Sequence, residues 1–214
     1  MSSSQRKKNS EALLRRNAIA VNHFLPMVEA EEKVELRTAE ELTARIVALW
    51  AVTGTAFVRN NFFRQYIIEN QLVGWLSAKE REYLLSNHRT ESQHIHFSWQ
   101  LEGLFFLGWC AGLVTDLALP TQESSVESFM HLFPQHGENL QKLDREIVIR
   151  SKREILDWSD LIYRLHWAVR DANVRGATPP PHIRAGVVQE WHRAVNWMTK
   201  YDQENDWDAV ATDT

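Results

Sequence analysis

The stretch that decides the fold is "SKREILDWSDLIYRLHWAVRDANVR", residues 151–175. It contains no glycine or proline, and its apolar side chains recur every three or four positions, which is the period of an α-helix. When residues are placed about every 100° around a helix axis, one broad arc is apolar: Ile155, Trp158, Leu161, Ile162, Leu165, Val169 and Ala172. The stretch therefore predicts a long helix over 152–175 that packs this arc into a core.

A second stripe of the same helix is charged. It consists of Arg153, Asp157, Asp160, Arg164, Asp171 and Arg175. Opposite charges three or four residues apart lie side by side on a helix surface and attract each other. We therefore expect Arg164 and Asp171 to belong to an ion-pair network at the surface or rim of the helix.

The remaining sector of the helix mixes polar and aromatic side chains: Leu156, Ser159, Tyr163, His166, Trp167 and Arg170. His166 and Arg170 are one turn apart, with Tyr163 beside both. Two interpretations stay open. The favoured one is a second packing face whose polar tips are bonded by another helix or by the C-terminal tail. The other is a functional pocket.

The rest of the chain also has helical spacing. Capping boxes are expected at Thr38, Ser77, Ser124 and Ser151, because each is followed three residues later by a glutamate. We expect helices at residues 10–20, 39–56, 59–72, 78–85, 91–114, 125–132, 138–150, 152–175 and 185–200, and "KVELR" at 33–37 could be a short extended segment. This pattern predicts an all-α, single-domain, multi-helical bundle over residues 1–214, with little or no β structure.

Two helices are expected to be central and largely buried, 91–114 and 152–175. In helix 91–114 apolar residues occupy every direction around the axis, and Glu102 is the anomaly within its most apolar part. A carboxylate in that setting needs a cationic partner or must stay protonated. We expect Glu102 to pair with an arginine, in the sector that contains His166 and Arg170.

The two ends of the chain lead to different expectations. Residues 1–9 are polar and basic, and we expect them to be disordered. Residues 201–214 are acidic but carry Trp207 between Asp206 and Asp208. The apolar body of that tryptophan should seek a groove. The sequence therefore predicts that the tail docks on the domain, with its aspartates near arginines.

Composition argues against several classes of protein. The net charge of −4 disfavours nucleic-acid binding. The single cysteine, Cys110, excludes an internal disulfide and a cysteine-based zinc site. The most hydrophobic stretch, 101–114, is shorter than the roughly 20 residues of a membrane span. Without a signal-peptide pattern, these features predict a cytoplasmic protein that does not enter a membrane.

The sequence lacks the common catalytic and metal-binding motifs. A glycine-rich phosphate loop, a GxSxG elbow and an HExxH motif do not occur. His94 and His96, like Glu190 and His192, are two residues apart and would point in different directions on a helix. No metal and no cofactor is therefore predicted.

Several longer segments resemble a known family. They are "LRTAEELTARIVAL", "FSWQLEGLFFLGWCAGL", "SKREILDWSDLIYRLHWAVRDA", "GVVQEWHRAVNWM" and "WDAVATDT". Together they resemble the family called domain of unknown function 4272, which occurs mainly in bacteria, over most of the chain from about Glu11 to Thr214. The resemblance implies recurring motif positions at Glu102, Arg164, His166, Arg170, Asp171, Glu190, His192, Asn196, Trp207, Asp208 and Asp213. It implies no activity, substrate or cofactor. One departure is Trp191, where the family often has a basic residue.

These features are compatible with two functions. The favoured one is a non-enzymatic cytoplasmic binding, interaction or regulatory protein that acts on an unidentified protein partner. The alternative is an enzyme or small-molecule binder with a pocket formed by Glu102, Tyr163, His166 and Arg170, and with His192 near it. In that pocket Arg170 would anchor an anionic ligand and His166 would move a proton. The sequence does not predict an oligomeric state.

Overall fold

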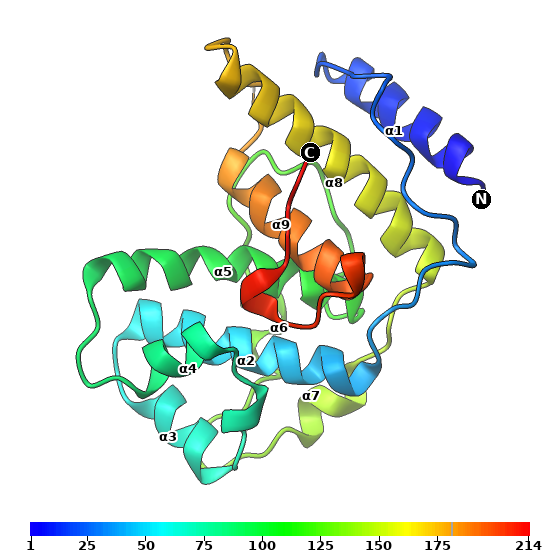
Figure 1. Ribbon diagram of the computed structural model, residues 1–214. Helices are drawn as coiled ribbons and strands as arrows, with labels where there is room; N and C mark the ends of the chain where they lie inside the picture. The colour runs from blue at the N-terminus through cyan, green and yellow to red at the C-terminus, as the bar shows by residue number, and fades with distance from the viewer. Residues whose placement is uncertain (181) are drawn as a thin grey trace.

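The computed structural model describes residues 1–180 and 182–214, and it confirms the all-α fold (Figure 1). No β-strand occurs within those two ranges. The helices are α1 (Ser3–Arg16), α2 (Ala39–Val58), α3 (Phe62–Glu69), α4 (Ala78–Leu85), α5 (Glu91–Cys110), α6 (Glu127–Met130), α7 (Gln141–Glu146), α8 (Lys152–Val174) and α9 (Ala185–Met198). Short 3-10 turns lie at Val73–Trp75, Tyr201–Gln203 and Trp207–Ala209.

Capping boxes start several of these helices. The predicted boxes at Thr38, Ser77 and Ser151 are confirmed, each with the hydroxyl and the glutamate three residues on bonded reciprocally. Thr90 begins α5 in the same way with Gln93, because glutamine can replace glutamate in this motif. These bonds satisfy backbone N–H groups that have no partner inside the helix, so the four helix starts are fixed locally.

The box predicted at Ser124 is wrong. Its hydroxyl donates instead to Oε2 of Glu102, at 2.6 Å, and its backbone N–H donates to Oε1 of the same residue, at 2.8 Å. The helix that follows, α6, begins only at Glu127 and has no side-chain cap. A buried carboxylate binds hydrogen-bond donors more strongly than a neutral group does, so the long-range partner replaced the local one.

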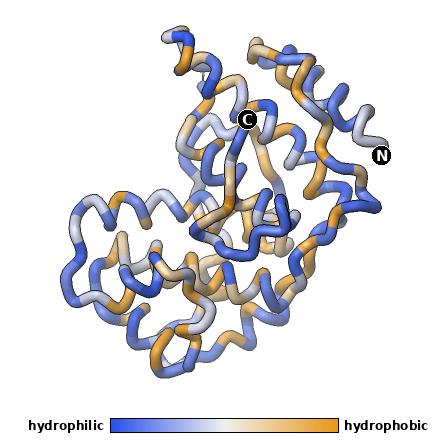
Figure 2. Tube along the Cα trace, in the orientation of Figure 1, coloured by the Kyte–Doolittle hydropathy of each residue, from blue (hydrophilic) through white to orange (hydrophobic). Residues whose placement is uncertain are grey.

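The centre of the fold is formed by α2 and α5, which pack against each other over most of their length. In Figure 1 they cross the lower half of the molecule, and α9 joins α5 to the long helix α8. Ile46 and Leu49 of α2 and Phe106 and Leu107 of α5 are fully buried. Figure 2 shows apolar and hydrophilic residues alternating along the helices, as expected where one side of each helix faces the core.

One helix, α2, is long and apolar enough to span a membrane by composition alone. Of its most apolar 18-residue window, 72% is buried within the protein. The core helix of a globular protein produces the same pattern, so α2 by itself is no indication of a membrane protein.

The expectation that residues 1–9 are disordered is wrong. They lie largely in α1, which begins at Ser3 and packs along α8, so that Leu14 joins Leu161 and Leu165 in a second apolar cluster. Arg6 is only 1% exposed, and its Nε donates to Oδ1 of Asp157 at 2.8 Å. Its partner lies 151 positions further along the chain, which explains why the local sequence of residues 1–9 does not reveal this order.

Residues 33–37, which could have been an extended segment, form no strand. Arg37 bonds them to the end of α9: its backbone N–H donates to the carbonyl of Met198, and its Nε donates to that of Trp197. Its Nη2 also donates to the carbonyl of Glu204, at 2.6 Å. One buried arginine therefore holds the α1–α2 connection and the residues after α9 beside each other.

Candidate functional site

A cavity of about 420 Å³ lies between α8, α9, the 26–34 segment of the α1–α2 connection, and the C-terminal residues 201–214, here called the tail. Its lining consists of Pro26, Met27, Val28, Glu29, Val34, Leu156, Ser159, Tyr163, His192, Asn196, Thr199, Tyr201, Asp213 and Thr214. Pockets for small ligands measure roughly 300–1,000 Å³ and combine apolar walls with a few polar groups. This space, called the ligand cavity below, has both properties.

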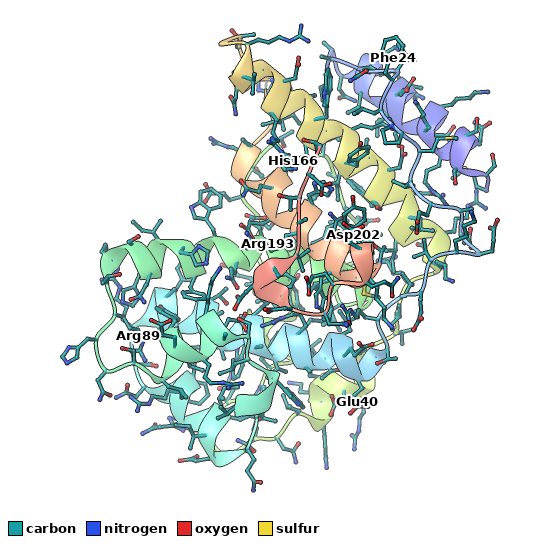
Figure 3. The ribbon with its side chains drawn as sticks, viewed as in Figure 1. Phe24, Glu40, Arg89, His166, Arg193 and Asp202 are labelled. Carbon is teal, nitrogen blue, oxygen red and sulfur yellow. The ribbon has the colours of Figure 1, made fainter. Side chains whose placement is uncertain are left out.

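At one wall of the cavity, two buried histidines face each other across the α8–α9 interface: His192 lines the cavity and His166 stands behind it. Nδ1 of His166 lies 2.8 Å from Nδ1 of His192, and the rings meet edge to face. In Figure 3 His166 is labelled between the two helices. Burial, together with the nearby charge of Arg170, lowers the pKa of His166 to about 4 and that of His192 to about 3. Both imidazoles are therefore neutral at pH 7.

Neutrality fixes how the two rings share protons. A hydrogen bond between two Nδ1 atoms needs one N–H and one lone pair. One ring therefore carries its proton on Nδ1 and the other carries its proton on Nε2. Because Nδ1 of His192 is occupied by His166, Nε2 is the nitrogen of His192 that remains for a molecule in the cavity.

An acidic and aromatic group stands at the tail side of the cavity. Tyr201 donates its hydroxyl to Oδ2 of Asp213 at 3.2 Å. Burial and the charge of Asp213 raise the pKa of Tyr201 to about 12, and burial with the same charge raises that of Tyr163. Both phenols therefore stay protonated at neutral pH, and Asp213 lies close enough to act on both.

The tail is held in place by contacts with α9 and with the start of α4. Asn196 of α9 donates from Nδ2 to the carbonyl of Ala211 at 2.8 Å. Further back, Asp208 accepts from the hydroxyl of Ser77 at 2.8 Å and from the backbone N–H of Lys79 at 2.9 Å, at the start of α4. A carboxylate at a helix N-terminus meets free N–H groups and the positive end of the helix dipole.

Trp207 anchors the same tail in the core. It is 3% exposed, stands edge to face with Trp197, and lies against Gly103 of α5, where an added Cβ would be 3.5 Å from its ring. The guanidinium of Arg45 lies 4.9 Å from its ring centre and is paired with the buried carboxylate of Glu80. The tryptophan thus fills a groove whose floor and charged edge come from α5, α2 and α4.

The structure brings together some of the residues that the sequence proposed and separates others. Tyr163, His192, Asn196 and Asp213 line the ligand cavity, and His166 stands behind His192. Arg170 is exposed outside the lining, where Nη1 donates to the hydroxyl of Thr214 at 3.4 Å. The proposed pocket of Glu102, Tyr163, His166 and Arg170 is therefore not assembled.

Glu102 does not pair with an arginine, which corrects the expectation for it. It is 2% exposed in the core, where it accepts from Ser124 and, at 3.2 Å, from Nε1 of Trp191. Burial raises the pKa of Glu102, and these hydrogen bonds oppose the shift. Trp191, which stands where the family often has a basic residue, thus supplies a neutral donor to Glu102. Glu190, the neighbour of Trp191, is also buried, at 8% exposed, and accepts from Nη1 of Arg193 at 3.2 Å.

The placement of Arg164 at the surface is also wrong. Arg164 is 2% exposed and makes a two-pronged pair with Asp160, at 2.8 and 2.9 Å, while Nη2 donates to the carbonyl of Pro26. The spacing of four residues predicted an ion pair, but the connection before α2 crosses over it and excludes water. Asp171 pairs with Arg175 at 2.9 Å in the exposed last turns of α8.

Sequence reasoning missed the apolar part of the lining. Met27, Val28 and Val34 lie in a connection without helical or strand periodicity, so nothing in their spacing indicated a site. Tyr201 was also missed, although an aromatic residue 12 positions from Asp213 in a tail expected to dock was a usable signal. Among the described residues, no cluster of three or more His, Cys, Asp or Glu side chains is placed to bind a metal ion.

Comparison with models of protein families gives a match over most of the chain. Residues 6–210 match the model of a family described as Domain of unknown function (DUF4272). No curated protein and no solved structure matches the chain. The match spans nearly the whole length, from the buried Arg6 of α1 to the tail beyond Trp207, and it confirms the resemblance noted in the sequence. The chain therefore belongs to the family of domain of unknown function 4272.

Proposed function

We propose that this protein binds a small molecule, and that the ligand cavity between α8, α9, the 26–34 segment and the tail is its binding site. The observation that carries the proposal is the 420 Å³ volume of the cavity together with its lining. Met27, Val28 and Leu156 offer apolar contacts, while Ser159 and Nε2 of His192 offer hydrogen bonds from buried positions. Both side chains line the cavity, so a bound molecule can meet their hydrogen-bonding atoms.

Binding is favoured over catalysis by the state of the histidines. A general base works best when its pKa lies near the working pH. The pKa values of about 4 for His166 and about 3 for His192 make both weak bases at neutral pH. They are suited to orient a ligand by hydrogen bonding and less suited to remove a proton from it.

The experiment compares two variants that carry the same substitution. Val28→Trp places an indole at the cavity lining, and Val174→Trp places it at the exposed end of α8, where the valine is 85% exposed. Native mass spectrometry and thermal-shift screening of a metabolite library are run on the wild type and both variants. We expect a molecule that binds the wild type and Val174→Trp but not Val28→Trp. Equal binding to all three proteins, or no binding molecule at all, would contradict the proposal.

A second candidate function, interaction with a protein partner, has its own observation. Phe24 is 97% exposed and projects from the edge of the molecule in Figure 3, and Ile95 and Trp99 are exposed one turn apart on α5. Exposed large apolar side chains are enriched where proteins associate. We propose a cytoplasmic location for either function, as composition predicts.

That candidate is tested with the wild type and with Phe24→Ser and Ile95→Ser/Trp99→Ser variants in capture experiments from the native host. A partner recovered in a fixed ratio by the wild type and lost with one of the variants supports it. A partner recovered equally by all three proteins, or none, contradicts it.

A further inference from the structure

We propose that the ligand is a small organic cation, an ammonium group carried on an apolar body of a few carbons. This inference rests on the proposed binding function and adds the class of ligand to it. Three features of the ligand cavity carry it: the sign of its charges, the aromatic rings beside those charges, and the apolar wall across from them.

The charged side chains of the lining are both acidic. Glu29 comes from the α1–α2 connection and Asp213 comes from the tail, and no lysine or arginine is among the lining residues. The histidine in the lining, His192, is neutral because burial lowers its pKa to about 3. A molecule entering the cavity therefore meets two negative charges and no positive one, which favours a cation and repels an anion.

Several cations close to the lining residues are bonded to other partners, among them Lys200, which pairs with Glu35. Arg164 is occupied by Asp160 in a buried pair. Lys152 donates to the backbone carbonyl of Val34 at 2.7 Å, and Arg170 reaches only the hydroxyl of Thr214 from its exposed position. None of these four belongs to the lining, so the negative sign of the cavity is not cancelled from within.

Aromatic rings stand beside the acidic group at the tail side. Tyr201 donates to Asp213. Tyr163 also lines the cavity, but its ring centre lies 5.9 Å from the guanidinium of Arg164. The face of a tyrosine ring attracts a cation, and pockets for alkylated ammonium groups combine such rings with carboxylates. Tyr201 bonds only Oδ2 of Asp213, so Oδ1 remains for a ligand, and Tyr201 and Asp213 together form a receptor for an ammonium group.

The apolar wall accounts for the body of the ligand. Met27, Val28, Val34 and Leu156 line the cavity together. Side chains of this kind gain free energy by covering hydrocarbon and not by contacting a bare metal ion. The combination of a charged, aromatic end and an aliphatic wall therefore points to an amphipathic amine and not to an inorganic cation.

The experiment uses the whole protein and probes matched in shape. Choline is compared with dimethylbutanol, its uncharged carbon isostere, and with the dimethylbutanoate anion; butylammonium serves as a primary amine. Binding is measured by saturation-transfer NMR and by isothermal titration. We expect at least one cation to bind and to compete with any molecule found in the metabolite screen, and the alcohol and the anion to bind more weakly or not at all.

Variants locate the effect. Asp213→Asn keeps an oxygen for Tyr201 but removes the charge, and Asp116→Asn removes a charge from an exposed loop residue outside the cavity. We expect Asp213→Asn to weaken cation binding by up to about fivefold, the upper end for one charge pair near solvent, and Glu29→Gln/Asp213→Asn to weaken it more. Asp116→Asn should leave it unchanged.

The outcomes separate this inference from the function on which it rests. If the alcohol or the anion binds as well as the cations and Val28→Trp abolishes that binding, the class of ligand is wrong and the binding function stands. If the cations do not bind while the library yields another molecule, the class is again wrong. If nothing binds the wild type in either experiment, both proposals fail.

Discussion

Nδ1 of His166 and Nδ1 of His192 lie 2.8 Å apart in the interface between α8 and α9. Both rings are buried, and both are neutral in the folded protein because burial lowers their pKa values to about 4 and about 3. The pair therefore joins two helices by one hydrogen bond that exists only while at least one ring is unprotonated. This relationship makes the stability of the fold depend on pH.

The first prediction concerns that dependence. In the unfolded chain both histidines have a pKa near 6.5. Below this pH the unfolded state therefore binds more protons than the folded state. Stability is therefore highest above pH 6.5 and falls as the pH drops from 6.5 towards 4 for His166 and towards 3 for His192, by about 1.4 kcal/mol per pH unit for each histidine. Urea denaturation at pH 7, 6 and 5 measures it.

Carboxyl groups also titrate in part of this range, so variants isolate the histidines. His166→Gln/His192→Gln should flatten the difference between pH 7 and pH 5, whereas His88→Gln, at an exposed position of the α4–α5 connection, should retain it. An unchanged pH dependence in the double variant would show that the pair is not the cause.

The second prediction concerns Glu102. Its carboxylate holds the backbone and hydroxyl of Ser124 and the indole N–H of Trp191 in a buried position. Glu102→Ala should lower the free energy of unfolding by about 3 kcal/mol, because donors without partners in the interior each cost about 1–3 kcal/mol. Glu102→Gln keeps one acceptor oxygen and should cost less. Chemical denaturation of both variants measures the two free energies of unfolding. Equal losses in Glu102→Ala and Glu102→Gln would contradict the prediction.

The third prediction tests the anchoring of the tail. Trp207→Ala should lower the free energy of unfolding by about 3–5 kcal/mol, the usual range for removing a buried aromatic ring. Deletion of residues 206–214 should lower the melting temperature at least as much as Trp207→Ala does. Gly103→Val, which pushes a branched side chain towards the same indole, should cost about 1–3 kcal/mol. Scanning calorimetry measures all three, and a tail deletion that melts like the wild type would refute docking.

A fourth prediction follows from the buried pair of Arg164 and Asp160. Removing one partner strands the other charge in the interior, so Asp160→Ala or Arg164→Met alone should cost about 3–5 kcal/mol. The double variant Asp160→Ala/Arg164→Met should cost less than the sum of the two, because neither charge remains. A double-mutant cycle by urea denaturation gives the coupling, and strict additivity would mean that the pair is not coupled.

The local features of the fold were predictable from the sequence. Thr38, Ser77 and Ser151 begin their helices where their spacing to a glutamate indicated, because a capping box involves only residues three positions apart. The period of 151–175 likewise predicted α8 to within a residue, since both packing faces repeat along it.

Long-range features were not predictable. The hydroxyl of Ser124 does not cap the following helix, because it donates to Glu102 of another helix, α5. Arg164 is buried because the carbonyl of Pro26 and its connection cover it, and no helical pattern contains that information. The cavity itself is built from the 26–34 segment and the tail, and its existence depends on how those irregular segments cross.

The position of the tail has one more consequence. Because Tyr201 and Asp213 form part of the cavity wall, and Asn196 holds that wall through the carbonyl of Ala211, the site is complete only while the last residues are seated. Occupancy and local opening of these residues are then coupled equilibria. A molecule bound there would therefore disfavour local opening of residues 201–214. In turn, any interaction that opens these residues would weaken binding in the cavity.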